Sequence, residues 1–318
     1  MIHSFHIVPG YGNIRSSIVA RVSRERTTIN MLISSDSSGV NGDDAASVAV
    51  PGSLALVTTD LCINGVHTPT EWSPYQRGAW AAGRALSDIA AMGGRPRAVV
   101  AALSIPDGEW DDVGDITRGI RERARASGCD LVGGDLSSAA SAHPSAPFTI
   151  CITCIGTPPA AGPRLMSDAR AGDLLVVTGT MGRAAAGSAE IPHRIEAATR
   201  LAGLCRAMTD ISDGIVEEVH TMADRSGLHL TLDLDAIPVD QQLMALADVD
   251  DHTLLAATWG DDYELLLSID PDHLGPAQDA VADLNIPLTA VGSCADGSGV
   301  TMVRNGRELT HTIRGFAH

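Results

Sequence analysis

The chain has 318 residues and a formal net charge of −17, and Arg supplies all 22 basic residues because the sequence contains no Lys. The length suggests about two domains, and 44% hydrophobic with 19% charged residues is typical of a globular protein. The negative charge argues against nucleic-acid and membrane partners, because these need a basic face. The missing Lys excludes a P-loop, Schiff-base chemistry and a Lys general base.

Residues 1–40 are rich in Ser, Arg and Gly, and we expect them to be irregular. The next segment alternates short apolar runs with amphipathic ones. Ser73 and Pro74 mark a helix start and Gly93-Gly94 its end. The run 157–163 has three Pro in TPPAAGP and predicts a linker. The patterns before it predict strands at 53–61, 96–105, 129–138 and 146–157, and helices at 73–94 and 111–128.

The second half repeats this style. A strand at 173–178 leads into a Gly-rich turn at 179–182, which either cradles a phosphate or simply joins a strand to a helix that begins at 183–189. Further patterns predict helices at 195–207, 214–227 and 275–286, and strands at 228–237, 263–270, 288–294 and 299–306. The sequence therefore predicts an α+β fold of two domains, 1–158 and 159–318, with mixed sheets and packed helices.

The six cysteines mostly lie in apolar stretches, as buried free thiols do. Cys151 and Cys154 are three apart in a predicted strand, so they should face opposite sides and share no metal. No apolar stretch approaches about 18 residues, and the first residues show no signal-peptide pattern. We therefore expect a cytoplasmic protein.

Short acidic motifs recur at predicted strand ends and turns: GDDAA at 42–46, TTD at 58–60, LSD at 86–88, GGD at 133–135 and TDISDG at 209–214. Mg²⁺ takes carboxylate oxygens together with substrate phosphates. The motifs could therefore converge on one such site. Each Asp also has an ordinary interpretation as a turn or cap residue, for example Asp213 as the N-cap of the helix that follows.

Asp88 is harder to explain as a surface residue. On its helix it is in line with Ala81, Ala85 and Met92, which form a small apolar stripe expected to face the core. A carboxylate there is costly unless it is paired or binds a metal. The position of Asp88 therefore favours a functional role.

Taken in order, these motifs resemble the thiamine-monophosphate kinases, within the superfamily that includes aminoimidazole ribonucleotide synthetase. The resemblance runs from about residue 42 to Phe316. It rests on the motifs GDDAA, TTD with GVH at 65–67, LSDIAAMG at 86–93, GGD, TDISDG and GDDYELL at 260–266. It implies a two-domain α+β fold of the aminoimidazole ribonucleotide synthetase type and a homodimer formed through the N-terminal domains.

The resemblance also implies that ATP and several Mg²⁺ ions bind between the domains, and that the γ-phosphoryl group of ATP passes to a phosphate monoester. Asp88, Asp210 and Asp213 would be catalytic. The nucleotide would meet Gly134, Asp135, Arg164 and Ser212, and the acceptor would meet His67, Asp261 and Phe316. The metals would be surrounded by Asp43, Asp44, Thr58, Thr59, Asp60, Asp88, Asp135, Asp210 and Asp213. This agrees with the sequence, because phosphoryl transfer mainly needs positioning and charge neutralisation.

The chain departs from the family at Asp261, where the family has Glu, and at Trp259, where it has a small residue. Two further interpretations therefore stand beside thiamine-monophosphate kinase. One is a paralogous kinase of a specialised pathway with another small acceptor. The other is an inactive ligand-binding dimer, against which the complete set of Asp residues argues.

Overall fold

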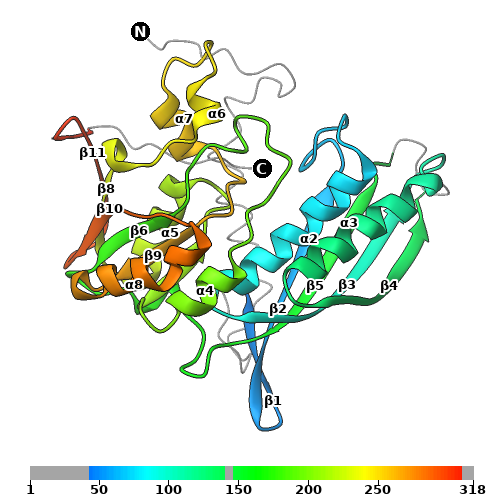
Figure 1. Cartoon of the computed structure of the whole chain (residues 1–318), viewed down its shortest axis with the longest axis horizontal. Coiled ribbons are helices and arrows are strands. Elements are labelled where there is room, and N and C mark those ends of the chain that lie inside the picture. Colours follow the sequence, from blue (N-terminus) through cyan, green and yellow to red (C-terminus); the bar gives the residue numbers. More distant parts are fainter. Residues whose placement is uncertain (1–42, 140–145, 310–318) are drawn as a thin grey trace.

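The computed structural model describes residues 43–139 and 146–309. Its strands form two separate sheets, one from residues 46–157 and one from residues 174–308 (Figure 1). This confirms the two-part α+β fold with mixed sheets, while the boundary after residue 158 stays a prediction. The expected irregular segment 1–40 and Phe316 lie outside the described residues.

The N-terminal sheet has the strand order β1-β2-β5-β3-β4. Two helices, α2 (Pro74–Ala91) and α3 (Val113–Ala126), pack on one face of it (Figure 1). Ser73 caps α2 through a reciprocal bond with Gln76, and Pro74 takes its first position, as predicted. The strands are β1 (Ala46–Val50), β2 (Ser53–Ile63), β3 (Arg95–Ile105), β4 (Asp130–Ser138) and β5 (Thr149–Thr157).

The C-terminal sheet has the order β12-β11-β8-β10-β6-β9-β7 and lies between two apolar layers. On one side pack α5 (Ile215–Ser226) and α7 (His252–Thr258), and on the other α4 (Ile195–Leu201) and α8 (Leu274–Val281). A short α6 (Gln241–Met244) precedes α7. The strands are β6 (Leu174–Thr178), β7 (Ala207–Asp210), β8 (His229–Asp233), β9 (Leu265–Ile269), β10 (Leu288–Ala295), β11 (Gly299–Arg304) and β12 (Arg307–Glu308).

Two sequence-based predictions about helices are wrong. Residues 183–187 form turns and 188–189 are irregular, instead of a helix start, because Gly182 and Gly187 have φ of 91° and 90°, outside the helical region. The helix predicted at 195–207 ends at Leu201, because Ala207 already begins β7 and the amide of Arg206 donates to the carbonyl of Ser268 beside it.

The predicted places of two carboxylates at strand ends are also wrong. Asp60 lies inside β2, which continues to Ile63, and Asp135 lies inside β4, which continues to Ser138. Inside a strand, side chains alternate between the two faces. Whether such a carboxylate can join a common site therefore depends on which face it occupies.

Candidate functional site

Strand β2 and helix α2 bring the first group of site residues together. Thr58 and Asp60 are two apart on β2 and so face the same side, toward α2. The hydroxyl of Thr58 donates to the Asp88 carboxylate at 2.5 Å. The Arg84 guanidinium, one helical turn before Asp88, donates to Asp60 at 3.1 Å. These pairs place two carboxylates and one buried cation in the space between the strand and the helix.

Two loops of the C-terminal part supply the second group. The segments 209–214 and 260–264 lie side by side, because the amide of Tyr263 donates to the carbonyl of Ile211 and that of Asp261 donates to the carbonyl of Ser212. Gly260 permits this approach, since a Cβ at that position would lie 2.3 Å from the carbonyl oxygen of Ser212. The TDISDG and GDDYE motifs therefore form one surface.

Hydrogen bonds link the GDD motif to the part of the chain after the linker. The Thr209 hydroxyl donates to Asp44 at 3.1 Å, and the amide of Met166 donates to Asp43 at 2.9 Å. Asp43 therefore anchors the segment after the linker, whereas one oxygen of Asp44 has no partner and is buried. The two Asp residues of the GDD motif therefore differ in their contacts, although the family resemblance predicted both as metal ligands.

Asp44, Asp60, Asp88 and Asp210 lie close enough for their charges to act on one another's pKa, and we call them the carboxylate cluster. Burial raises the pKa of Asp88 well above its usual value, and the charges of Asp60 and Asp210 raise it further. Burial, then Asp210 and Asp43, likewise raise the pKa of Asp44. The pKa of Asp210 is raised to about 6 by burial, with Asp60 contributing. The cluster thus concentrates negative charge that a bound cation would stabilise.

Glu218 belongs beside this cluster, and the sequence-based prediction missed it. Burial raises its pKa well above normal, with the charges of Asp213 and Asp44 as the next causes. Its carboxylate accepts the amide of Asp213 at 3.2 Å. Asp213 is therefore not the N-cap of α5; that position is Gly214, with φ of 88°. Glu218 lies on the apolar face of α5 with Ile215 and Val219, so the test that singled out Asp88 would also have found it.

The cluster fits a magnesium ion in one specific respect. One carboxylate oxygen of Asp44 and one of Asp210 are buried with no hydrogen-bond partner, which is costly unless a ligand satisfies them. Across residues 43–139 and 146–309, however, no three His, Cys, Asp or Glu side chains stand close enough to hold a metal by themselves. This matches the usual Mg²⁺ site, in which one or two carboxylates act with water and substrate phosphates.

The predicted acceptor residues His67 and Asp261 lie near Arg84. Arg84 and His67 both lower the pKa of Asp261, which burial raises. The hydroxyl of Tyr263 donates to Asp261 at 2.9 Å, and its ring packs edge-on against Trp80 with ring centroids 5.8 Å apart. Asp261 and Tyr263 have φ of 69° and 50°, a backbone region that side chains other than Gly, Asn and Asp rarely adopt. Such strain is concentrated at functional sites.

The structure does not bring four predicted residues into the cluster within one chain. Thr59 faces the opposite side of β2, where its hydroxyl contacts Thr153 at 3.1 Å, because strand residues alternate. Gly134 and Asp135 lie on β4, three strands from β2 and thus roughly 14 Å away at about 4.8 Å per strand. Arg164 donates to the carbonyl groups of Ala161 and Gly162 in its own loop.

The Gly-rich turn at 179–182 has a structural task. The amides of Gly182 and Arg183 donate to the buried carboxylate of Asp262 at 2.8 to 3.0 Å. Glu264 likewise accepts from Arg194 and Thr178 at 2.5 to 2.6 Å. The amides of Gly182 and Arg183 are therefore already hydrogen-bonded to Asp262, and the interpretation of the turn as a phosphate cradle is wrong. The turn instead supports the loop that carries Asp261.

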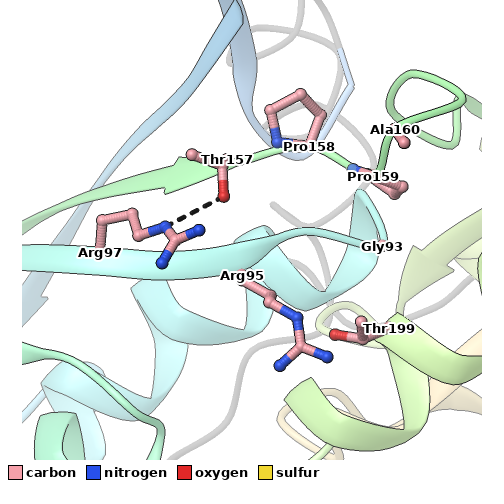
Figure 2. A pocket seen from close by; sticks show the side chains of 8 residues that line it. All are labelled: Gly93, Arg95, Arg97, Thr157, Pro158, Pro159, Ala160 and Thr199. Atoms are coloured by element: carbon pink, nitrogen blue, oxygen red, sulfur yellow. Dashed lines mark hydrogen bonds between the residues drawn. The ribbon is translucent and has the colours of Figure 1, made fainter.

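A pocket lies near the end of α2 and the linker (Figure 2). It is lined by Arg95, Arg97, Thr157 and Thr199, among others. Arg97 donates to Thr157 at 3.1 Å, and Arg95 lies 3.8 Å from Glu196, so both cations have polar partners. No residue of the predicted site lines this pocket.

Two negative expectations about the chain can be compared with the structure. All six cysteines are free, and Cys151 and Cys154 lie on opposite faces of β5. Within the described segments, the structure has no helix with the length and apolar character needed to cross a membrane.

Comparisons with known proteins give consistent matches. The model for AIR synthase related protein, N-terminal domain, matches residues 42–157, and that for the C-terminal domain matches residues 170–305. A thiamine-monophosphate kinase of Corynebacterium glutamicum is 34% identical over 74% of this chain and 82% of its own length. One from Pyrococcus horikoshii is 29% identical over 93% of this chain and 96% of its own.

Solved structures agree on the fold. AaThiL complexed with AMPPCP and TMP superposes with a TM-score of 0.79 at 24% identity, covering 97% of this chain and 99% of its own. Thiamine-monophosphate kinase from Stenotrophomonas maltophilia superposes with a TM-score of 0.72 at 27% identity, covering 90% and 96%.

Proposed function

The chain belongs to the thiamine-monophosphate kinase family of AIR synthase related proteins, and on this basis we propose that it transfers the γ-phosphoryl group of ATP to thiamine monophosphate. The product is thiamine diphosphate. Relatives at 27% to 34% identity carry this name, and the structure of AaThiL holds an ATP analogue together with TMP.

The observation that carries the proposal is the carboxylate cluster between the two domains. Asp44, Asp60 and Asp88 come from the N-terminal part and Asp210 from the C-terminal part. Two of their oxygen atoms are buried without a partner. Clustered buried carboxylates destabilise the folded protein, and binding of the cations that accompany a polyphosphate would offset this cost.

The chemistry places modest demands on the protein. A phosphate monoester is already an anionic nucleophile near neutral pH, so no general base is needed, and the chain has no Lys to act as one. The difficulty is repulsion between two anions that must approach in line. The protein has to hold donor and acceptor together and exclude water, which a site between two domains does.

We propose that Mg²⁺ ions bind at the carboxylate cluster, each held by one or two of Asp44, Asp60, Asp88 and Asp210 together with water and substrate phosphate. Asp43, Asp213 and Thr58 lie beside these carboxylates and keep their predicted place at the metal site as proposals. When bound, Mg²⁺ would neutralise charge on the transferring phosphoryl group. The Thr58 hydroxyl fixes the orientation of Asp88, Asp43 accepts the amide of Met166 after the linker, and the backbone amide of Asp213 donates to Glu218. The donor set of hard oxygen atoms suits Mg²⁺ rather than a soft metal.

The other site assignments stay proposals. Ser212 lies beside Asp213 and suits the nucleotide side, and His67 with Asp261 suits the acceptor side. Gly134, Asp135 and Arg164 would meet the nucleotide, although none of them joins the cluster in a single chain. The assignment of Phe316 to the acceptor rests on the sequence alone. The proposed location in the cytoplasm also rests on the sequence alone.

We also propose a homodimer formed through the N-terminal sheet. The face of this sheet opposite α2 and α3 exposes Leu61 by 48% and Ile155 by 40%, next to Thr59 and Thr153. An apolar sheet face of this kind is normally covered. A second copy would cover it, and the exposed strand β4 with Asp135 would then lie at or near the interface.

A screen of ATP consumption tests the proposed reaction. The acceptors are thiamine monophosphate, unphosphorylated thiamine and a panel of other phosphate monoesters, each with Mg²⁺. We expect ADP release with thiamine monophosphate well above that with the panel. Turnover of another monoester alone would favour the paralogous kinase, which the substitution at Asp261 and its bond to Tyr263 make the second candidate. No turnover with any acceptor would favour the inactive dimer.

A further inference from the structure

Arg84 is a buried cation beside the carboxylate cluster. Its side chain on α2 is 11% exposed and donates one hydrogen bond to Asp60, at 3.1 Å. Its Nε and Nη1 atoms are buried and have no hydrogen-bond partner. A guanidinium can donate five hydrogen bonds, and leaving buried donors unpaired costs stability. A partner that arrives with a ligand would remove this cost.

The surroundings of Arg84 indicate which ligand this is. Its charge acts on Asp60 and Asp210 in the cluster and on Asp261 on the acceptor side. Tyr263 and Cys62 also lie near Arg84. Arg84 is therefore close both to the carboxylate cluster and to the proposed acceptor residue Asp261.

A phosphate group bound here would supply the hydrogen-bond acceptors that Nε and Nη1 of Arg84 lack. Phosphate oxygen atoms accept the paired N–H groups of a guanidinium, and such charge-assisted bonds are among the strongest in proteins. Ser212 and Asp213, on the nucleotide side, donate to Glu218 and not to Arg84.

We propose that Arg84 binds the phosphate of the acceptor and makes the enzyme selective for a phosphate monoester over the corresponding alcohol. This rests on the proposed kinase function and assigns it a residue that the family motifs do not include. Arg84 holds the nucleophilic phosphate next to the carboxylate cluster and offsets part of its charge. The residue acts by binding and neither gives nor takes a proton, because Arg stays charged.

The test compares Arg84→Met and Arg84→Lys with the control Arg77→Met. Arg77 lies on the same helix with the same 11% exposure, but its guanidinium donates to the carbonyl groups of Thr70 and Trp72. Calorimetry measures the affinities for thiamine monophosphate and for unphosphorylated thiamine, with Mg²⁺ and a non-hydrolysable ATP analogue present. Steady-state kinetics separates KM for the acceptor from kcat and from KM for ATP.

We expect Arg84→Met to weaken thiamine monophosphate binding by about 10- to 100-fold, the value of hydrogen bonds to a charged group, and to leave thiamine binding unchanged. Arg84→Lys should recover part of the loss, and Arg77→Met should keep the wild-type preference. Equal weakening for both ligands, or a rise in KM for ATP alone, would overturn the inference.

The outcomes also separate this inference from the proposed function. If the wild type binds thiamine monophosphate but does not turn it over, the kinase proposal fails while the binding comparison still decides the role of Arg84. If it binds neither thiamine compound, inorganic phosphate becomes the probe. Arg84→Met must then lose phosphate affinity at least 10-fold, and an unchanged affinity would overturn the inference.

Discussion

Asp88 is the residue whose role can be tested most sharply. Asp88→Asn keeps the shape of the side chain but removes a charge next to Asp60 and Asp210. We expect turnover to fall by roughly 10²-fold, as removal of one electrostatic stabiliser does in other enzymes, while the fold is retained or stabilised because repulsion decreases. Asp224→Asn, at an exposed position on α5, serves as the control. Wild-type turnover and Mg²⁺ dependence of Asp88→Asn would contradict its assignment.

The buried carboxylates should also make stability depend on pH. The pKa of Asp210 is raised from 3.8 to about 6, so the folded chain binds more protons than the unfolded chain in this range. Stability of the metal-free protein should therefore fall as the pH rises from about 4 through about 6, by up to about 3 kcal/mol from Asp210 alone. Denaturant unfolding with a chelator measures this, and Asp210→Asn should flatten the profile.

Mg²⁺ should reverse this loss, because metal binding needs deprotonated carboxylates. We expect a larger increase in unfolding free energy on adding Mg²⁺ at pH 8 than at pH 5. Equal stabilisation at both values would argue against binding at the cluster.

The packing of α2 on α3 sets the position of Asp88 and Arg84. Gly119 allows a close approach, since a Cβ there would lie 2.2 Å from the carbonyl oxygen of Tyr75. Gly119→Ala should separate the helices and destabilise the protein by about 1–3 kcal/mol, as overpacking does. Gly114→Ala, on the same helix with no atom within 4 Å of the added Cβ, should be neutral or stabilising. Thermal unfolding compares the two, and equal effects would show that the close contact is unimportant.

The elements also show what the sequence can predict. A capped, amphipathic helix such as α2 has local signals at both ends, and its one misplaced carboxylate, Asp88, is visible as a break in an apolar stripe. Thr59 shows the opposite case, because a motif match ignores strand alternation and includes a side chain on the wrong face. Arg84 lies one turn before Asp88 on the same stripe, but it was not singled out, because the end of an Arg side chain on a helix normally reaches the surface. Only the tertiary structure places it beside Asp60.

At the scale of the whole molecule, the exposed apolar sheet face predicts a dimer. Leu61→Glu places a charge on this face and should yield a monomer at tens of micromolar by light scattering, because burying an unpaired charge is costly. Met244→Glu, at a position 56% exposed on α6, should leave the association state unchanged. A monomeric wild type, or a dimer unaffected by Leu61→Glu, would contradict the proposed interface.

We infer that the carboxylate cluster between the domains supports phosphoryl transfer from ATP to thiamine monophosphate. The most direct measurement follows ³²P from [γ-³²P]ATP in the presence of Mg²⁺ and thiamine monophosphate, and locates the label in the product. We expect the label in the terminal phosphate of thiamine diphosphate, formed by the wild type and strongly reduced in Asp88→Asn. Label found only in inorganic phosphate, or labelled thiamine diphosphate formed equally well by Asp88→Asn, would contradict the account.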